Sequence, residues 1–194
     1  MIYIIRHGET DWNQEGRCQG RADIELNSKG IEQAKKISDQ LKNIEFDMVF
    51  SSPLKRAYCT AQIIRSNKIV VDNRIIERNN GKLEGMLKAE YIELINFNDL
   101  SENEYEVEPL EEFRSRINNF LDETITNYKN KNVLIVTHAG VSIYMKCYFE
   151  GEPIDGNFHK LKLKNCEVLI YSNESDQSQI WYKKTQELIF VFFN

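Results

Sequence analysis

Residues 1–10 read MIYIIRHGET. This stretch opens with a run of apolar side chains, and Arg6 and His7 follow that run directly. Four further apolar, β-branched runs lie at residues 48–50, 69–71, 133–136 and 168–171. Uninterrupted apolar runs of this kind are typical of strands that are buried on both faces of a sheet. The opening stretch is therefore expected to form one of five such strands.

Helical patterns separate these runs. Apolar residues recur with a helical period within residues 31–41, 54–64 and 110–128, the last being the longest stripe. Ser52 and Pro53 are expected to be the cap and the first residue of the second helix. Strands that alternate with helices predict an α/β fold, a three-layer sandwich with a mainly parallel central sheet and helices on both faces. Residues 180–182 and 188–193 are expected to add strands at the edge of the sheet.

The length and composition indicate one globular domain that spans residues 1–194, with a small cap insertion at about 82–108. Hydrophobic residues make up 41% and charged residues 28% of the chain, which is the balance of an ordinary soluble protein. A net charge of −5 argues against nucleic acid as a partner, because binding to its backbone favours a basic surface. No signal peptide and no apolar run of membrane-spanning length is visible. We therefore expect a cytoplasmic protein without nucleic-acid or membrane partners.

Two of the three histidines occupy equivalent places in this pattern. His7 follows the first predicted strand, and His138 follows the fourth. Arg6 adjoins His7, Arg56 lies just past the second strand, and Glu77 follows the third. Ligands of open parallel sheets bind outside the carboxyl ends of the strands. These five side chains are therefore expected to converge on one rim of the sheet.

The residue types on this rim match one reaction, the transfer of a phosphoryl group. Arginine forks such as Arg6 and Arg56 suit the dianion of a phosphate monoester. A neutral His7 offers a ring nitrogen as nucleophile, and a protonated His138 stabilises charge on the phosphoryl oxygens. The leaving alkoxide needs a proton, which Glu77 can supply.

Other chemistries fit the sequence poorly. The motifs GxxxxGK(S/T), GxGxxG, HExxH and GxSxG are absent, and the four cysteines form no CxxC pair that would suggest a zinc site. Scattered cysteines are typical of free thiols in a reducing compartment. Two arginines beside the histidines would also repel a cation, so we expect neither a metal nor a cofactor.

Ordered motifs run through about residues 1–172. They are RHGET at 6–10 with Asn13 and GRCQG at 16–20, SSPLKRA at 51–57, ERNNGKLEG at 77–85, and THAGV at 137–141. In this order they resemble the histidine phosphatases, also called the phosphoglycerate-mutase-like superfamily. The resemblance implies a metal-independent enzyme with a phosphohistidine at His7 and a proton donor at Glu77. The substrate-binding residues that it implies, besides the catalytic His138, are Arg6, Asn13, Gln19, Gly20, Arg56, Arg78 and Ala139.

The sequence also departs from the family pattern. The family often has Gly-Glu-Ser before its long helix, where this chain has Val107-Glu108-Pro109. Many members have two glycines or Gly-Asn after the second histidine, where this chain has Ala139 and Gly140. Cofactor-dependent mutases usually have Arg and Tyr at the places of Arg78 and Asn80, so Arg78 fits a mutase whereas Asn80 does not. These changes are expected to reshape the rim of the pocket while the core chemistry stays the same.

Three functions are compatible with these motifs. The favoured prediction is a phosphatase that acts on a small phosphate ester, because the stretch between Gly85 and Pro109 is short for the substrate-enclosing insertions of a mutase. A cofactor-dependent phosphoglycerate mutase and a non-catalytic binding or regulatory domain are the alternatives. The full set of motif residues argues against the non-catalytic domain. The apolar segment 188–193 leaves formation of a homodimer open.

Overall fold

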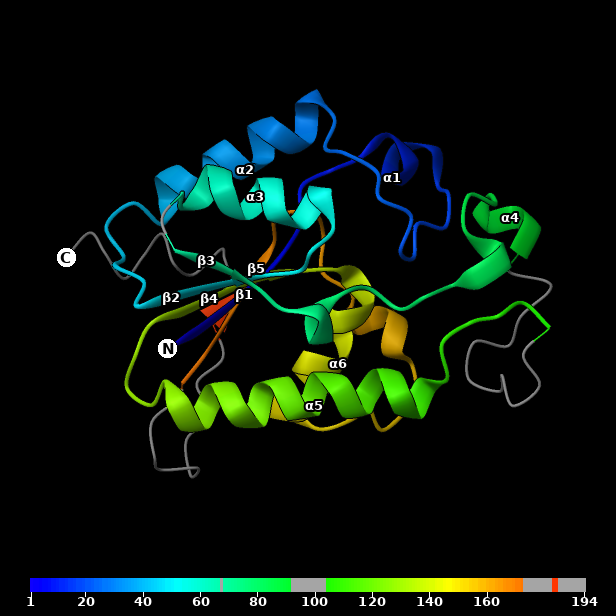
Figure 1. Cartoon of the computed structure of the whole chain (residues 1–194). Helices are drawn as coiled ribbons and strands as arrows, with labels where there is room; N and C mark the ends of the chain where they lie inside the picture. The colour runs from blue at the N-terminus through cyan, green and yellow to red at the C-terminus, as the bar shows by residue number, and fades with distance from the viewer. Residues whose placement is uncertain (67, 92–103, 173–182, 185–194) are drawn as a thin grey trace.

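The computed structural model describes residues 1–66, 68–91, 104–172 and 183–184. A six-stranded sheet with the order β3-β2-β4-β1-β5-β6 forms the centre of this part of the chain (Figure 1). The strands are β1 (Ile2–Arg6), β2 (Met48–Ser51), β3 (Ile69–Val71), β4 (Val133–Thr137), β5 (Val168–Tyr171) and β6 (Lys183–Lys184). The first four pair in parallel, whereas β5 and β6 run antiparallel to their neighbours. The mainly parallel α/β sheet and its five predicted strands are confirmed.

Helices cover both faces of the sheet. Helices α2 (Ser28–Gln40) and α3 (Lys55–Ile64) lie on one face, and α5 (Leu110–Asn127) and α6 (Ala139–Glu150) lie on the other (Figure 1). Successive side chains of a strand point to opposite faces. In β1, Ile2 and Ile4 therefore pack into the core under α5 and α6, while Tyr3 and Ile5 pack under α2 and α3. Two cores against one sheet make the predicted three-layer sandwich.

Several local predictions need correction. Helix α3 begins at Lys55 instead of Pro53, with Leu54 as its N-cap, and Ser52 accepts a hydrogen bond from the Leu54 N–H at 3.3 Å. The sequence did not reveal α6, because its apolar residues surround the helix and leave no polar face to mark a stripe. Elements of one turn or little more also escaped prediction. These are α1 (Asp11–Glu15), α4 (Lys88–Tyr91), η1 (Asn73–Ile75), η2 (Gly81–Leu83) and η3 (Phe158–Leu161).

Some predictions fall partly or wholly outside the described residues. The strands expected at 180–182 and 188–193 lie there, as does part of the cap insertion expected at about 82–108. The single domain with a cap therefore remains a prediction. Within the part of the chain that the structure describes, no helix is long and apolar enough to cross a membrane.

Candidate active site

The site lies where β1 and β4 end, side by side at the centre of the sheet. Arg6 pairs with Thr137 in the last register position of these strands, so His7 and His138 leave the sheet as neighbours. Their ring centroids are 5.2 Å apart. A cavity of about 310 Å³ opens beside them, which is the size of a site for a small metabolite. The predicted convergence of the two histidines is thus what the structure shows.

The imidazole of His7 is buried and has one ring nitrogen available for chemistry. Its Nδ1 lies 2.7 Å from the carbonyl oxygen of Gly8. Because a carbonyl oxygen only accepts hydrogen bonds, Nδ1 carries the hydrogen and Nε2 keeps its lone pair. Burial, followed by the positive charges of Arg56 and Arg6, lowers the pKa of His7 well below its usual value. The ring is therefore neutral at neutral pH, as a nucleophile must be.

Two buried guanidinium groups flank His7. Arg6 donates to the carbonyl oxygen of Leu163 at 2.8 Å, and Arg56 donates to those of Ala22 and Gly20, both at 2.7 Å. Burial lowers the pKa of both side chains, that of Arg56 to about 10. Among the described residues neither arginine forms an ion pair, and the Nε of each is buried without a hydrogen-bond partner. Buried cations without a direct ion-pair partner are costly, and a bound anion relieves that cost.

The carboxylate of Glu77 is held against the first turn of α6. Its Oε1 accepts a hydrogen bond from the N–H of Arg78 at 2.9 Å, and its Oε2 accepts one from the N–H of Gly140 at 3.0 Å. A Cβ at position 140 would lie only 2.5 Å from Oε1 of Glu77. A side chain at position 140 would therefore displace the Glu77 carboxylate from this position.

His138 lies behind His7 and is fully buried. Its Nε2 is 2.6 Å from Oγ of Ser52, and its Nδ1 has no hydrogen-bond partner among the described residues. Burial, followed by the neighbouring Arg56, His7 and Arg6, lowers its pKa well below the usual value. The surroundings thus favour a neutral His138, which differs from the protonated ring considered in the sequence analysis.

The cavity wall contains the other predicted site residues. They are Arg6, Asn13, Gln19, Gly20, Arg56, Glu77, Arg78 and Ala139, whereas His138 does not reach the wall. The sequence did not single out further members of the wall, among them Arg17, His159, Lys162, Phe113, Tyr144 and Phe158. Phe158, His159 and Lys162 come from the segment after α6, which carries no motif. The wall also contains Asn80, from the motif at 77–85, and Lys88 and Tyr91, which follow that motif.

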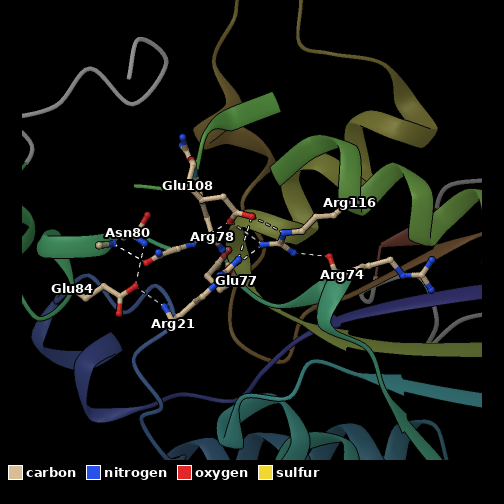
Figure 2. A network of polar contacts seen from close by, with 10 residues as sticks. Arg21, Arg74, Glu77, Arg78, Asn80, Glu84, Glu108 and Arg116 are labelled. Atoms are coloured by element: carbon tan, nitrogen blue, oxygen red, sulfur yellow. Dashed lines mark hydrogen bonds and ion pairs between the residues drawn. The ribbon is translucent and has the colours of Figure 1, made fainter. Parts of the chain in front are cut away.

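A polar network holds the loop that carries Glu77 (Figure 2). Glu108 accepts two hydrogen bonds from Arg116, at 2.8 and 3.0 Å, and forms an ion pair with Arg21 at 3.2 Å. Both arginines also donate to the carbonyl oxygen of Glu77, at 3.2 Å from Arg21 and 3.1 Å from Arg116. Arg78 donates to the carbonyl oxygen of Glu108 at 2.8 Å. Glu108 and Arg116 therefore connect α5 to the backbone of Glu77 and to the side chain of Arg78.

The mainly parallel α/β sheet places two adjoining histidines beside two buried arginines, Arg6 at the end of β1 and Arg56 in the first turn of α3, an arrangement suited to enzymes that act on phosphate esters. The chain belongs to the histidine phosphatase superfamily (branch 1), which matches residues 2–184. It is 39% identical over 142 residues to a Bacillus subtilis (strain 168) protein named uncharacterized phosphatase PhoE, covering 71% of each chain. It is 34% identical to phosphoserine phosphatase 1 of Hydrogenobacter thermophilus, covering 77% of this chain and 76% of that one. The solved structure of Bacillus stearothermophilus YhfR is similar, with a TM-score of 0.78, 25% identity and 95% of each chain covered.

Proposed function

We propose that this chain hydrolyses the phosphate monoesters of small metabolites through a phosphohistidine at His7. One observation carries the proposal: a neutral, buried imidazole presents a free Nε2 between two guanidinium groups that have no ionic partner among the described residues. Arginine forks grip the oxygens of a phosphate dianion, and a neutral ring nitrogen is the form that attacks phosphorus.

The reaction proceeds in two steps. In the first, Nε2 of His7 forms a bond to phosphorus while the bond from phosphorus to the ester oxygen breaks, and Glu77 acts as the general acid that gives a proton to the departing alkoxide. In the second, water attacks phosphorus, Glu77 takes a proton from that water, and the N–P bond breaks to release inorganic phosphate. The hydrogen bond from Nδ1 of His7 to Gly8 stabilises the positive charge that the ring carries while phosphorylated.

The charge of the cavity wall supports a substrate that bears a second anionic group. Its cationic side chains are Arg6, Arg17, Arg56, Arg78, Lys88 and Lys162. Glu77 is the one carboxylate among the described residues of the wall. A phosphate dianion offsets only part of this excess, and the relative from Hydrogenobacter is named for phosphoserine, which also carries a carboxylate. We expect a higher kcat/KM for O-phosphoserine and 3-phosphoglycerate than for glycerol 3-phosphate, and the reverse order would contradict this substrate class.

A phosphoglycerate mutase is the second candidate, since the same excess of positive charge suits a bisphosphorylated intermediate. A coupled assay with 3-phosphoglycerate, with and without 2,3-bisphosphoglycerate, separates the two activities. The phosphatase proposal predicts that phosphate release is faster than isomerisation under both conditions. Isomerisation that outpaces phosphate release would make the chain a mutase.

Replacement of the nucleophile tests the proposal with a generic substrate. We expect His7→Ala to abolish turnover of para-nitrophenyl phosphate, because no other ring nitrogen in the described cavity is held between the two arginines. Circular dichroism and thermal melting of the variant check that it is folded. Wild-type turnover by a folded His7→Ala protein would overturn the mechanism.

A further inference from the structure

The hydroxyl group of Ser52 lies beside the second histidine because of the order of the strands. β2 pairs in parallel with β4, and the N–H of Ser52 donates to the carbonyl oxygen of Val136 at 3.1 Å. This pairing brings Oγ of Ser52 to 2.6 Å from Nε2 of His138, and both residues are fully buried. The contact is as short as a strong hydrogen bond between neutral groups.

The direction of this hydrogen bond follows from the other hydrogen bond that the Ser52 hydroxyl group forms. Oγ of Ser52 already accepts a hydrogen bond from the N–H of Leu54 at 3.3 Å. Its own hydrogen needs an acceptor, and among the described residues Nε2 of His138 is the one in reach. If Nε2 instead donated to Oγ, the serine would hold a buried hydroxyl hydrogen without an acceptor, which is unfavourable.

An Nε2 that accepts leaves the ring hydrogen on Nδ1. A neutral imidazole carries one hydrogen, on one nitrogen or the other. Nδ1 of His138 is buried without a protein partner among the described residues, and the ring stands beside that of His7 with centroids 5.2 Å apart. Oxygens of a phosphoryl group on His7 are acceptors that would satisfy an Nδ1–H donor in this position.

We propose that Ser52 is a positioning residue that holds His138 in its Nδ1–H tautomer and so aims an N–H donor at the phosphoryl group on His7. The benefit to catalysis rests on the proposed phosphohistidine at His7, whereas the tautomer of His138 does not depend on it. The neutral ring can then stabilise the transition state by donating from Nδ1. His138 thus needs no second proton, which its surroundings disfavour, to act on the phosphoryl oxygens. Loss of the serine hydroxyl frees the ring to place its hydrogen on Nε2. The Nδ1 lone pair would then face negatively charged oxygens and repel them.

Nitrogen-15 NMR of the full chain reads the tautomer directly. Long-range proton–nitrogen spectra distinguish protonated from unprotonated ring nitrogens, and the chain has only three histidines. Variants His7→Gln and His159→Gln assign the signals. At neutral pH we expect an unprotonated Nε2 and a protonated Nδ1 for His138. A wild-type spectrum with a protonated Nε2 on His138 would overturn the proposal, so the test does not depend on the folding of any serine variant.

Two serine variants then test the consequence for turnover. We expect Ser52→Ala to shift the His138 hydrogen to Nε2 and to lower kcat by about 10²-fold, the loss typical of one missing donor to a developing oxyanion. KM for para-nitrophenyl phosphate should change little. The matched control is Ser51→Ala, which removes a buried hydroxyl that donates to the carbonyl oxygen of Ser52 at 2.9 Å and should keep both the tautomer and kcat.

The outcomes separate this proposal from the proposed function. A folded Ser52→Ala protein that retains the Nδ1–H tautomer or the wild-type kcat would refute the role of Ser52. Absence of a phosphohistidine at His7 would instead refute the catalytic scheme and leave the measured tautomer of His138 unaffected. Agreement of the wild-type spectrum, the Ser52→Ala shift and the Ser51→Ala control would establish Ser52 as the residue that orients His138.

Discussion

Removal of the Glu108 carboxylate should destabilise the protein through the network in Figure 2. Glu108 binds Arg116 through two hydrogen bonds, and their side chains are 10% and 16% exposed. Removing one partner of a buried pair costs about 3–5 kcal/mol. The ion pair to Arg21, whose side chain is 38% exposed, adds little, and Arg116 keeps the carbonyl oxygens of Arg74 and Glu77 as acceptors. We therefore expect Glu108→Ala to lose about 3 kcal/mol, the lower end of that range.

Thermal and urea unfolding measure this loss. A loss of about 3 kcal/mol lowers Tm by roughly 6–12 °C for a chain of this size. The matched control is Glu112→Ala, which removes an exposed carboxylate from the first turn of α5, the helix that carries Arg116, and should change the free energy of unfolding by less than about 1 kcal/mol. A Glu108→Ala protein as stable as the Glu112→Ala control would refute the reasoning.

The effect of Glu108 should also depend on pH. Burial alone would raise the pKa of its carboxyl group, but hydrogen bonds and charge from Arg116, with further contributions from Arg21 and the N–H of Asn79, outweigh burial and hold the pKa below its usual value. A lowered pKa in the folded state means that the stabilisation is complete above the unfolded pKa of about 4.3 and is lost as pH falls through the folded value. The stability gap between wild type and Glu108→Ala should therefore narrow below about pH 4. A gap that is constant from pH 7 to pH 3 would exclude an electrostatic origin.

Three substitutions in the site give further expected outcomes. Glu77→Gln should reduce kcat more for alkyl than for aryl phosphates, because an aryl oxide leaves with less help from an acid; equal losses would remove the acid role. Gly140→Ala, whose Cβ would lie 2.5 Å from Oε1 of Glu77, should show the same preference in milder form, and unchanged kinetics on alkyl esters would mean that the carboxylate need not occupy this position. Arg56→Ala should raise KM at least about 10-fold, since it removes a buried fork worth roughly 1.5–3 kcal/mol, and an unchanged kcat/KM would place Arg56 outside the phosphate pocket.

The sequence predicts the centre of the site well, because a simple rule of parallel sheets is sufficient. His7 and His138 each follow an apolar strand, and the carboxyl ends of parallel strands lie on one edge of the sheet. The same rule places Arg56 and Glu77 at this edge, because they follow the second and third predicted strands. The apolar stripes of α2, α3 and α5 are likewise visible, since each has a polar face that contrasts with a buried one.

The remaining parts depend on information that is not local in the chain. Ser52 reads as a helix cap, and its contact with His138 follows only once β2 is known to lie next to β4. Lys162 reaches the cavity from a segment without a periodic pattern. In the sequence, Glu108 is only the middle residue of a stretch that departs from a family motif on either side of it, whereas the structure places its carboxylate between Arg116 of α5 and Arg21. Strand order and long-range ion pairs thus decide what the sequence leaves open.

Rapid-quench trapping of the enzyme during turnover tests the central claim most directly. Wild-type protein should be mixed with a phosphorus-32 ester, quenched in base, digested and mapped. We expect a label on the His7 peptide that survives base and is lost in acid, as expected of a phosphoramidate on a ring nitrogen, and no label in His7→Ala. A wild-type enzyme that turns over without this label at any quench time, or that carries it on another residue, would contradict the account.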